Sequence, residues 1–261
     1  MIISAAQSVL GLASGMLVGF SLGLVGGGGS ILAVPLMVYV VGVPQPHVAI
    51  GTSAIAVAAN AAINLSNHAR GGTVIWSCAL IFAASGMVGA FGGSILGKMV
   101  DGQKLLALFA LVMIVIAMLM LKTRARIGLP DVKVSMSNMP AIVSLGLATG
   151  TMSGFFGIGG GFLIVPALLM ATRMPIRLAI GTSLVVVTAL GASTAASYAL
   201  SGYVDWQLVG LLVLGGIAGT VPGQWAGRRL ADRKRALNLG FALVVIAVGL
   251  SIVVRGLPAL G

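Results

Sequence analysis

Ala49-Ile50-Gly51-Thr52-Ser53 returns 130 residues later as Ala179-Ile180-Gly181-Thr182-Ser183. Two further motifs flank this pentapeptide, in the same order, in both halves of the chain. The glycine run Gly26–Gly29 with Val34-Pro35 returns as Gly157-Ile158-Gly159-Gly160-Gly161 with Val165-Pro166, and Gly72-x-Val74-x-Trp76 returns as Gly202-x-Val204-x-Trp206. Self-similarity at a fixed offset is the signature of an internal repeat. The sequence therefore predicts two tandem copies of one structural unit.

The composition around these motifs is typical of a chain embedded in lipid. Of the 261 residues, 59% are hydrophobic and only 7% are charged, whereas soluble domains carry about 25% charged residues. The 15 Lys and Arg residues lie in short gaps between apolar runs, so they favour membrane orientation over nucleic-acid binding. The first base is Arg70, so the basic start of a signal peptide is missing and the first apolar run is expected to remain as a span.

Long apolar runs recur along both halves, and a membrane helix needs about 20 such residues. Two shorter runs, 30–42 and 161–172, follow the glycine clusters and are too short to cross unaided. The predicted fold is an all-α polytopic membrane protein. It has two tandem repeats of about four transmembrane helices each, plus one glycine-rich broken or re-entrant half-helix per repeat. The eight long runs are about 4–25, 48–66, 74–97, 105–121, 141–156, 178–200, 206–227 and 236–254.

The repeats are expected at residues 1–121 and 140–261, joined by a basic loop at 122–139. Because cytoplasmic gaps are enriched in Lys and Arg, the basic gaps at 98–104 and 228–235 are both expected on the cytoplasmic side. That requires an even number of spans per copy, hence a parallel repeat, yet it leaves the basic central loop outside. If the short runs cross fully, each copy has five spans, the repeat is inverted, and the two gaps face opposite sides.

The glycine clusters are the first candidate for chemistry. A helix that begins inside the bilayer offers unpaired backbone N–H groups and a positive dipole end, and glycine lets an anion approach that backbone. Broken helices of this kind bind anionic groups in transporters. The alternative is close helix packing through small residues. The residues expected to bind an anion are Gly27, Gly28, Gly29 and Ser30 in the first copy and Gly159, Gly160 and Gly161 in the second.

Polar side chains near the clusters form a second group of candidates. Thr52-Ser53 and Thr182-Ser183 each open a long apolar helix, where their hydroxyls either cap the helix or donate to an anion. Asn60 and Asn64 follow at helical spacing and are expected to line a pathway, with hydrogen bonding between helices as the alternative. His47 and Arg177 precede the two Gly-Thr-Ser motifs at equivalent positions. A base there either attracts an anion to the mouth of a pathway or marks the membrane interface.

The positions of the acidic residues indicate which class of solute the protein carries. All four, Asp101, Asp131, Asp205 and Asp232, lie outside the apolar runs, whereas pumps and cation carriers place carboxylates within membrane helices. Cation transport is therefore disfavoured, and so is an integral membrane enzyme, which needs clustered titratable groups. Neither a metal site nor a cofactor is predicted.

These doubled motifs resemble those of the sulfite exporter (TauE/SafE-type) family of membrane transporters, over about residues 10–255. The resemblance implies a multi-pass protein of a bacterial or archaeal inner membrane that carries sulfite, sulfoacetate or related sulfur oxyanions. The second copy departs from the all-glycine run at Ile158, so the two copies need not contact substrate equally.

The function expected from the sequence is a secondary transporter that exports sulfite, organosulfonates or related small anions by alternating access. The glycine-opened half-helices would meet near the midplane, and one copy would rock against the other. An anion channel, or a transporter of another small organic anion, is the alternative. The expected partners are the anion and the lipid bilayer; the sequence leaves the oligomeric state open, a homodimer included.

Overall fold

The computed structural model describes residues 4–122, 138–157, 159, 161–229 and 234–256, and every regular element in these ranges is helical. The all-α prediction is confirmed. In chain order the elements are α1 (Ala5–Val25), the 3₁₀ helix η1 (Gly26–Leu32), α2 (Ala33–Pro35), the π-helix η2 (Leu36–Val40), α3 (Pro46–Arg70), α4 (Trp76–Met99), α5 (Gly102–Lys122), α6 (Met139–Phe156), α7 (Gly161–Thr172), α8 (Ile176–Leu200), α9 (Trp206–Arg229) and α10 (Lys234–Gly256).

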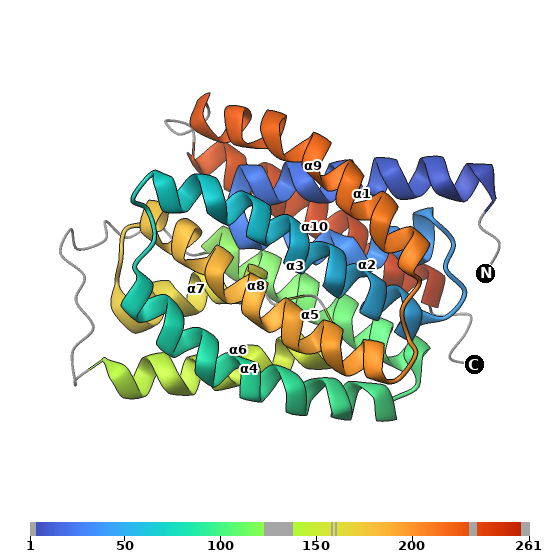
Figure 1. The fold of residues 1–261 in the computed structure, drawn as a ribbon, viewed down its shortest axis with the longest axis horizontal. Coiled ribbons are helices and arrows are strands. Elements are labelled where there is room, and N and C mark those ends of the chain that lie inside the picture. Colours follow the sequence, from blue (N-terminus) through green and yellow to red (C-terminus); the bar gives the residue numbers. More distant parts are fainter. Residues whose placement is uncertain (1–3, 123–137, 158, 160, 230–233, 257–261) are drawn as a thin grey trace.

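The long helices run side by side along one axis of the molecule (Figure 1). Within the described residues, six of them (α1, α3, α4, α6, α8 and α9) are long and apolar enough to cross a membrane. The sequence also predicts spans at 105–121 and 236–254, and both ranges lie within helices, α5 and α10. The two short apolar runs, predicted at 30–42 and 161–172, appear as Gly26–Val40, which includes the first glycine cluster, and Gly161–Thr172.

Glycines bind the outer helices together in two pairs, α1 with α9 and α4 with α6 (Figure 1). A Cβ added at Gly19 of α1 would collide with the carbonyl of Gly216 on α9, and one at Gly150 of α6 would collide with the carbonyl of Gly86 on α4. Such contacts are possible only where small residues let two backbones touch. Each pair joins a helix from the first half of the chain to a helix from the second half.

Hydrogen bonds show how the helices between these pairs are directed. The backbone N–H of Asp205, just before α9, donates to Thr52 Oγ1 near the start of α3 at 2.9 Å. At the other end of α3, Asn67 Nδ2 donates to Gln224 Oε1 at 3.2 Å. Thus α3 and α9 are parallel. Since α8 ends where the loop to Asp205 begins, α8 runs antiparallel to both.

The two ends of the helix bundle carry different bases. We call one the arginine end, because α3 ends there at Arg70, α8 begins there beside Arg173 and Arg177, and α9 ends there at Arg229. The other is the lysine end, where α4 ends beside Lys98 and α5 begins beside Lys104. The gaps after α4 and after α9 therefore lie at opposite ends, and the prediction that both face the cytoplasm is wrong.

The physical reason lies in the first glycine break. Gly15 of α1 packs on Leu212 of α9, and Gly23 packs on Thr220, so α1 starts at the lysine end, as α9 does. The short elements then return the chain to the lysine end, where α3 begins. Helix α1 crosses from the lysine end to the arginine end, and the short elements η1, α2 and η2 cross back. Three long helices, α3, α4 and α5, then complete the first half, which therefore ends at the arginine end. Helix α6 packs parallel to α4 and so begins at the arginine end. Residues 123–137 of the central loop lie outside the described ranges.

Candidate functional site: two glycine breaks at the centre

The two glycine clusters interrupt the helices where the sequence predicts. Helix α1 ends at Gly26, whose φ of 73° is in the region that favours glycine, and the chain continues as the 3₁₀ helix η1. Helix α6 ends at Gly157 with φ 67°, and Gly159 has the same φ before α7 begins at Gly161. Four consecutive glycines weaken an α-helix by about 1 kcal/mol each, which explains why the chain breaks here.

The two breaks touch each other in the buried interior. Gly26, Gly27, Gly28, Gly29 and Ser30 are all buried, as is Gly161. A Cβ added at Gly161 would collide with the carbonyl oxygen of Gly27. A Cβ added at Gly27 would lie 3.1 Å from the Gly161 Cα and 2.8 Å from Val187 Cγ2. The backbones of the two breaks are thus in direct contact, with no room for a methyl group at Gly161. Gly160 lies outside the described residues.

The repeated Ala-Ile-Gly-Thr-Ser motifs bind each half to the other. A Cβ at Gly157 would collide with Ile50, and one at Gly26 would lie 2.6 Å from Ile180 Cγ2, so the isoleucine of each motif packs on the opposite break. The threonines act in the same crosswise way. Thr52 accepts from the Asp205 N–H at 2.9 Å, and Thr182 accepts from the Ile75 N–H at 3.0 Å.

The glycines of these motifs let the opposite loops come close. A Cβ at Gly51 would collide with the carbonyl of Tyr203, and one at Gly181 with the carbonyl of Thr73. In each motif the glycine therefore lets the loop of the opposite half pack closely, and the threonine accepts a hydrogen bond from that loop. Sequence reasoning expected a cap or an anion donor at these threonines; in the structure they secure the start of a helix, but one from the other half of the chain.

The serine hydroxyls predicted at the site bond within their own segments. Ser30 donates to Gly27 O at 3.0 Å, Ser53 to Ile50 O at 3.0 Å and Ser183 to Ile180 O at 2.8 Å. Ser30 is the one that lies in a break itself, so its bond helps to hold the shape of η1.

The asparagines predicted to line a pathway lie between α3 and α9. Asn64 donates to Thr220 Oγ1 at 3.1 Å and accepts from Gln224 Nε2 at 2.9 Å. Asn60 donates to the Leu212 carbonyl at 3.4 Å, and its Oδ1 is buried with no hydrogen-bond partner among the described residues. The geometry of Asn64 is that of the alternative, hydrogen bonding between helices, whereas Asn60 retains a free acceptor.

His47 and Arg177 occupy opposite ends of the bundle. His47, near the start of α3, packs its ring against Tyr203 and Tyr198 at the lysine end, with centroid distances of 5.5 and 6.4 Å. Arg177 is exposed near the start of α8 at the arginine end. If both side chains attract anions, they do so at opposite ends of the transport pathway.

Loss of the crosswise threonine bonds should destabilise the protein. Thr52→Val and Thr182→Val each leave a loop N–H without its partner, which costs about 1–3 kcal/mol. We expect a similar drop in melting temperature for the two variants, because their bonds are alike. Thr188→Val is the control, since Thr188 bonds within its own helix, to Leu184 O at 2.8 Å. Melting temperatures equal to that of the control would refute a locking role.

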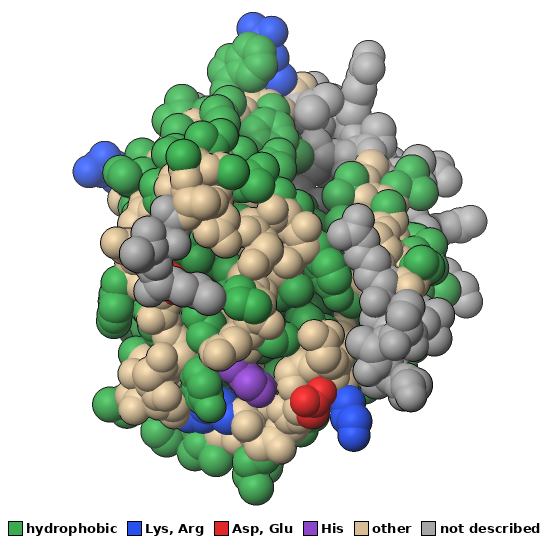
Figure 2. All heavy atoms as spheres, turned by 90° about the vertical axis from the view of Figure 1, so that its right-hand side faces the viewer, with side chains coloured by type: hydrophobic (Ala, Val, Ile, Leu, Met, Phe, Trp, Pro, Cys, Tyr) green, Lys and Arg blue, Asp and Glu red, His purple; other side chains and the backbone are tan. Residues whose placement is uncertain are grey.

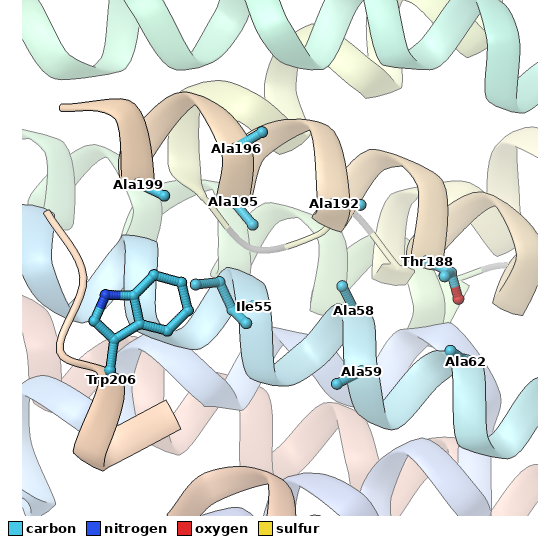
Figure 3. Close-up of a pocket in the computed structure, with 10 residues that line it drawn as sticks. All are labelled: Ile55, Ala58, Ala59, Ala62, Thr188, Ala192, Ala195, Ala196, Ala199 and Trp206. Atoms are coloured by element: carbon cyan, nitrogen blue, oxygen red, sulfur yellow. The ribbon is translucent and has the colours of Figure 1, made fainter. Parts of the chain in front are cut away.

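A surface cavity with none of the predicted site residues in its lining lies beside α8 (Figure 3). It has a volume of about 460 Å³ and lies between α3 and α8, next to Trp206. Its lining is mostly alanine, with Thr188 as the main polar group, so it offers little to an anion. The second cavity, lined by residues of α5 and α6, is apolar too. Neither is lined by a predicted site residue. The lining of the larger cavity is Ile55, Ala58, Ala59, Ala62, Thr188, Ala192, Ala195, Ala196, Ala199 and Trp206.

Lys98 is the residue with functional potential that sequence reasoning missed, because it was counted only as a topology signal. Its ammonium donates to Ser197 O, Ser197 Oγ and Ser201 Oγ at 2.8–3.0 Å, beside the ring of Tyr198. In the described part of the chain, no three His, Cys, Asp or Glu side chains lie close enough to hold a metal ion.

The sequence family agrees with this architecture. The family model described as "Sulfite exporter TauE/SafE" matches residues 11–252. The chain belongs to the TauE/SafE family. It is therefore a multi-pass membrane protein of a transporter family and not an enzyme, and the resemblance seen in its motifs is confirmed.

Relatives in several organisms share nearly the whole length. The chain is 49% identical to a "Probable membrane transporter protein" of Xylella fastidiosa, strain 9a5c, over 97% of both chains. It is 26% identical to the "Probable membrane transporter protein YunE" of Bacillus subtilis, over 93% of this chain and 96% of YunE. A "Probable membrane transporter protein" of Haemophilus influenzae is 28% identical, over 92% of this chain and 96% of that one. No solved structure is significantly similar to the chain.

Proposed function

We propose that this transporter is a secondary carrier of small anions that exports sulfite, organosulfonates or related sulfur oxyanions across the inner membrane. The observation that carries the proposal is the contact between the two buried glycine breaks, Gly27 and Gly161. Irregular backbone at membrane depth occurs where it is buried in protein or lines a cavity, and broken helices in transporters present their main-chain amides to anions. The family description supplies the sulfur oxyanion class.

The charge distribution supports an anion rather than a cation. No Asp or Glu of the described residues is buried, so no buried carboxylate would repel an anion there. Bases lie at both ends of the bundle. We place the arginine end in the cytoplasm, because cytoplasmic loops are enriched in Arg and Lys.

We further propose that the halves are inverted copies related by an axis in the membrane plane. Three kinds of contact occur twice, between residues that differ by 130 or 131 positions: Gly19 with Gly216 and Gly150 with Gly86; Thr52 with Asp205 and Thr182 with Ile75; Gly157 with Ile50 and Gly26 with Ile180. Inverted repeats with a site at their interface are common in secondary transporters.

This interleaving changes the motion expected for alternating access. Helix α1 is packed backbone to backbone on α9, and α6 on α4, so the first half cannot rock against the second as a rigid body. The moving bodies are instead the mixed pairs, α1 with α9 and α4 with α6. In the present conformation the two breaks are in contact, and an anion reaches their amides when these pairs separate.

Flux measurements test the proposal. In proteoliposomes, uptake of radiolabelled sulfite should saturate with concentration and rise when sulfite is also present inside, as exchange by a carrier requires. Competing methanesulfonate and taurine should reduce the uptake if organosulfonates share the site. Unitary currents in planar bilayers would favour the anion channel, and absence of sulfite and sulfonate flux from folded protein would refute the proposed substrate class.

A further inference from the structure

The Lys98 side chain contacts the end of another helix, α8. It lies at the lysine end, so with the arginine end placed in the cytoplasm, as proposed above, the preference for cytoplasmic bases does not account for it. Its side chain is half-buried, and every hydrogen-bond partner it has among the described residues is neutral: Ser197 O, Ser197 Oγ and Ser201 Oγ. No carboxylate in the described ranges pairs with it. A partly desolvated charge without a counter-charge is costly unless something else neutralises it.

Two buried polar atoms of the aromatic cluster His47, Tyr198 and Tyr203 have no hydrogen-bond partner among the described residues. Tyr198, whose ring lies 5.7 Å from the Lys98 Nζ, is 0% exposed, and its hydroxyl bonds to nothing. The Nδ1 of His47 is buried and unpaired as well, and the His47 ring packs against Tyr198 and Tyr203. Buried polar atoms are nearly always paired, so each of these two atoms is available to a ligand or a water. Figure 2 looks onto this end, with a histidine at the surface, a Lys or Arg beside it on one side, and an acidic side chain followed by a Lys or Arg on the other.

The aromatic cluster of His47, Tyr198 and Tyr203 lies between the lysine end and the glycine breaks. Tyr198 belongs to the same buried hydrophobic cluster as Ile31 of η1, Ile50 of α3 and Phe156, the residue before Gly157. Ile50 itself packs on Gly157 of the second break. An anion held beside Tyr198 would therefore be next to the site proposed above, separated from it by these side chains.

We propose that Lys98, Tyr198 and His47 form an anion-binding station at the lysine end, which binds a small oxyanion on its way between that side of the membrane and the glycine breaks. The inference rests on the proposed function. Lys98 supplies the charge, and the Tyr198 hydroxyl supplies a hydrogen bond. The hydroxyls of Ser197 and Ser201 hold the ammonium until the oxyanion replaces them, and His47 lines the outer side of the station.

The competing explanation is structural. Lys98 lies in the last turn of α4 and donates to a carbonyl near the end of α8, so it also neutralises two helix C-termini. That role would affect stability, but it would not make transport depend on which membrane face the anion meets first.

The test compares sulfite transport in right-side-out and everted vesicles, because the station faces one side only. Lys98→Gln should raise the KM for sulfite about tenfold when the anion arrives at the lysine end, the size expected for one lost charged hydrogen bond. The KM from the arginine end should stay within about twofold of wild type. Tyr198→Phe, which removes only the hydroxyl, should give a smaller rise on the same side, and Lys98→Arg should restore much of the affinity. Lys104→Gln is the matched control, since Lys104 is an exposed base at the same end.

Each outcome decides the matter. A one-sided rise in KM supports the station. An unchanged KM, an equal rise from both sides, or a fall in melting temperature alone overturns it and leaves Lys98 as a helix-end contact. A separate readout, stabilisation of the purified protein by sulfite, is expected to weaken in Lys98→Gln. If wild type shows saturable flux and this variant behaves like wild type, only the station fails; if wild type shows no flux, the proposed function fails.

Discussion

Gly161→Ala should abolish anion flux, because the new methyl group would collide with the carbonyl oxygen of Gly27. That contact holds the two breaks together, and both sides of it are backbone, so neither can turn away as a flexible side chain could. The breaks must shift apart, and the amides proposed to bind the anion lose their arrangement. We expect sulfite flux in proteoliposomes to fall by at least about a hundredfold, as small displacements of a binding geometry can produce.

Gly27→Ala provides a graded companion to this variant. Its Cβ would meet Val187 Cγ2 at 2.8 Å and the Gly161 Cα at 3.1 Å. A side chain yields more easily than backbone, so the loss of flux should be smaller. Gly92→Ala is the control, because nothing lies within 4 Å of a Cβ at that position on α4. Melting temperature and elution volume identify variants that fail to fold. Folded Gly161→Ala protein with wild-type flux would remove the breaks from the transport mechanism.

Gly19→Leu and Gly150→Leu should cause the largest losses of stability. Gly19 touches the carbonyl of Gly216, and Gly150 touches that of Gly86, so a leucine at either position separates a helix pair. Overpacking a tight contact typically costs about 1–3 kcal/mol, and a four-carbon side chain between two backbones should exceed that range. We therefore expect both variants to unfold at a much lower temperature, or at a lower concentration of a denaturing detergent, than wild type. The size of the effect should be similar in the two variants.

Gly210→Leu is the matched control for these two variants. It lies on α9, the helix that carries Gly216, but nothing lies within 4 Å of a Cβ there. Its stability should stay close to that of wild type. If Gly19→Leu were as stable as this control, α1 and α9 could not form a close pair in the membrane.

The helix breaks could be predicted because their cause is local. A run of glycines weakens a helix wherever it occurs, so Gly26–Gly29 and Gly157–Gly161 mark the breaks without knowledge of the neighbours. The direction of the chain after a break is not local. It depends on whether the short run continues or returns, and its length alone gives no answer. For that reason the parity of the spans, and with it the placement of the two basic gaps, was predicted wrongly.

Contacts between the halves also escaped sequence reasoning. The repeat shows that Thr52 and Thr182 are equivalent, but not that each bonds to the loop of the opposite half. The stripe of Asn60 and Asn64 identifies a polar helix face, while the identity of the helix opposite, α9, follows only from packing. Lys98 carried no signal of its own, because its neighbours Tyr198 and Ser201 are about 100 residues away in the chain.

The exchange of helices between the halves has a consequence for biogenesis. Helix α4 is synthesised before its partner α6, and α1 waits even longer for α9, so each must enter the bilayer with a glycine-lined face still uncovered. A polypeptide that stops after α5 should therefore be a target for proteolysis. Supplying the missing half as a separate chain should rescue it, since two complementary fragments can form both helix pairs, α1 with α9 and α4 with α6.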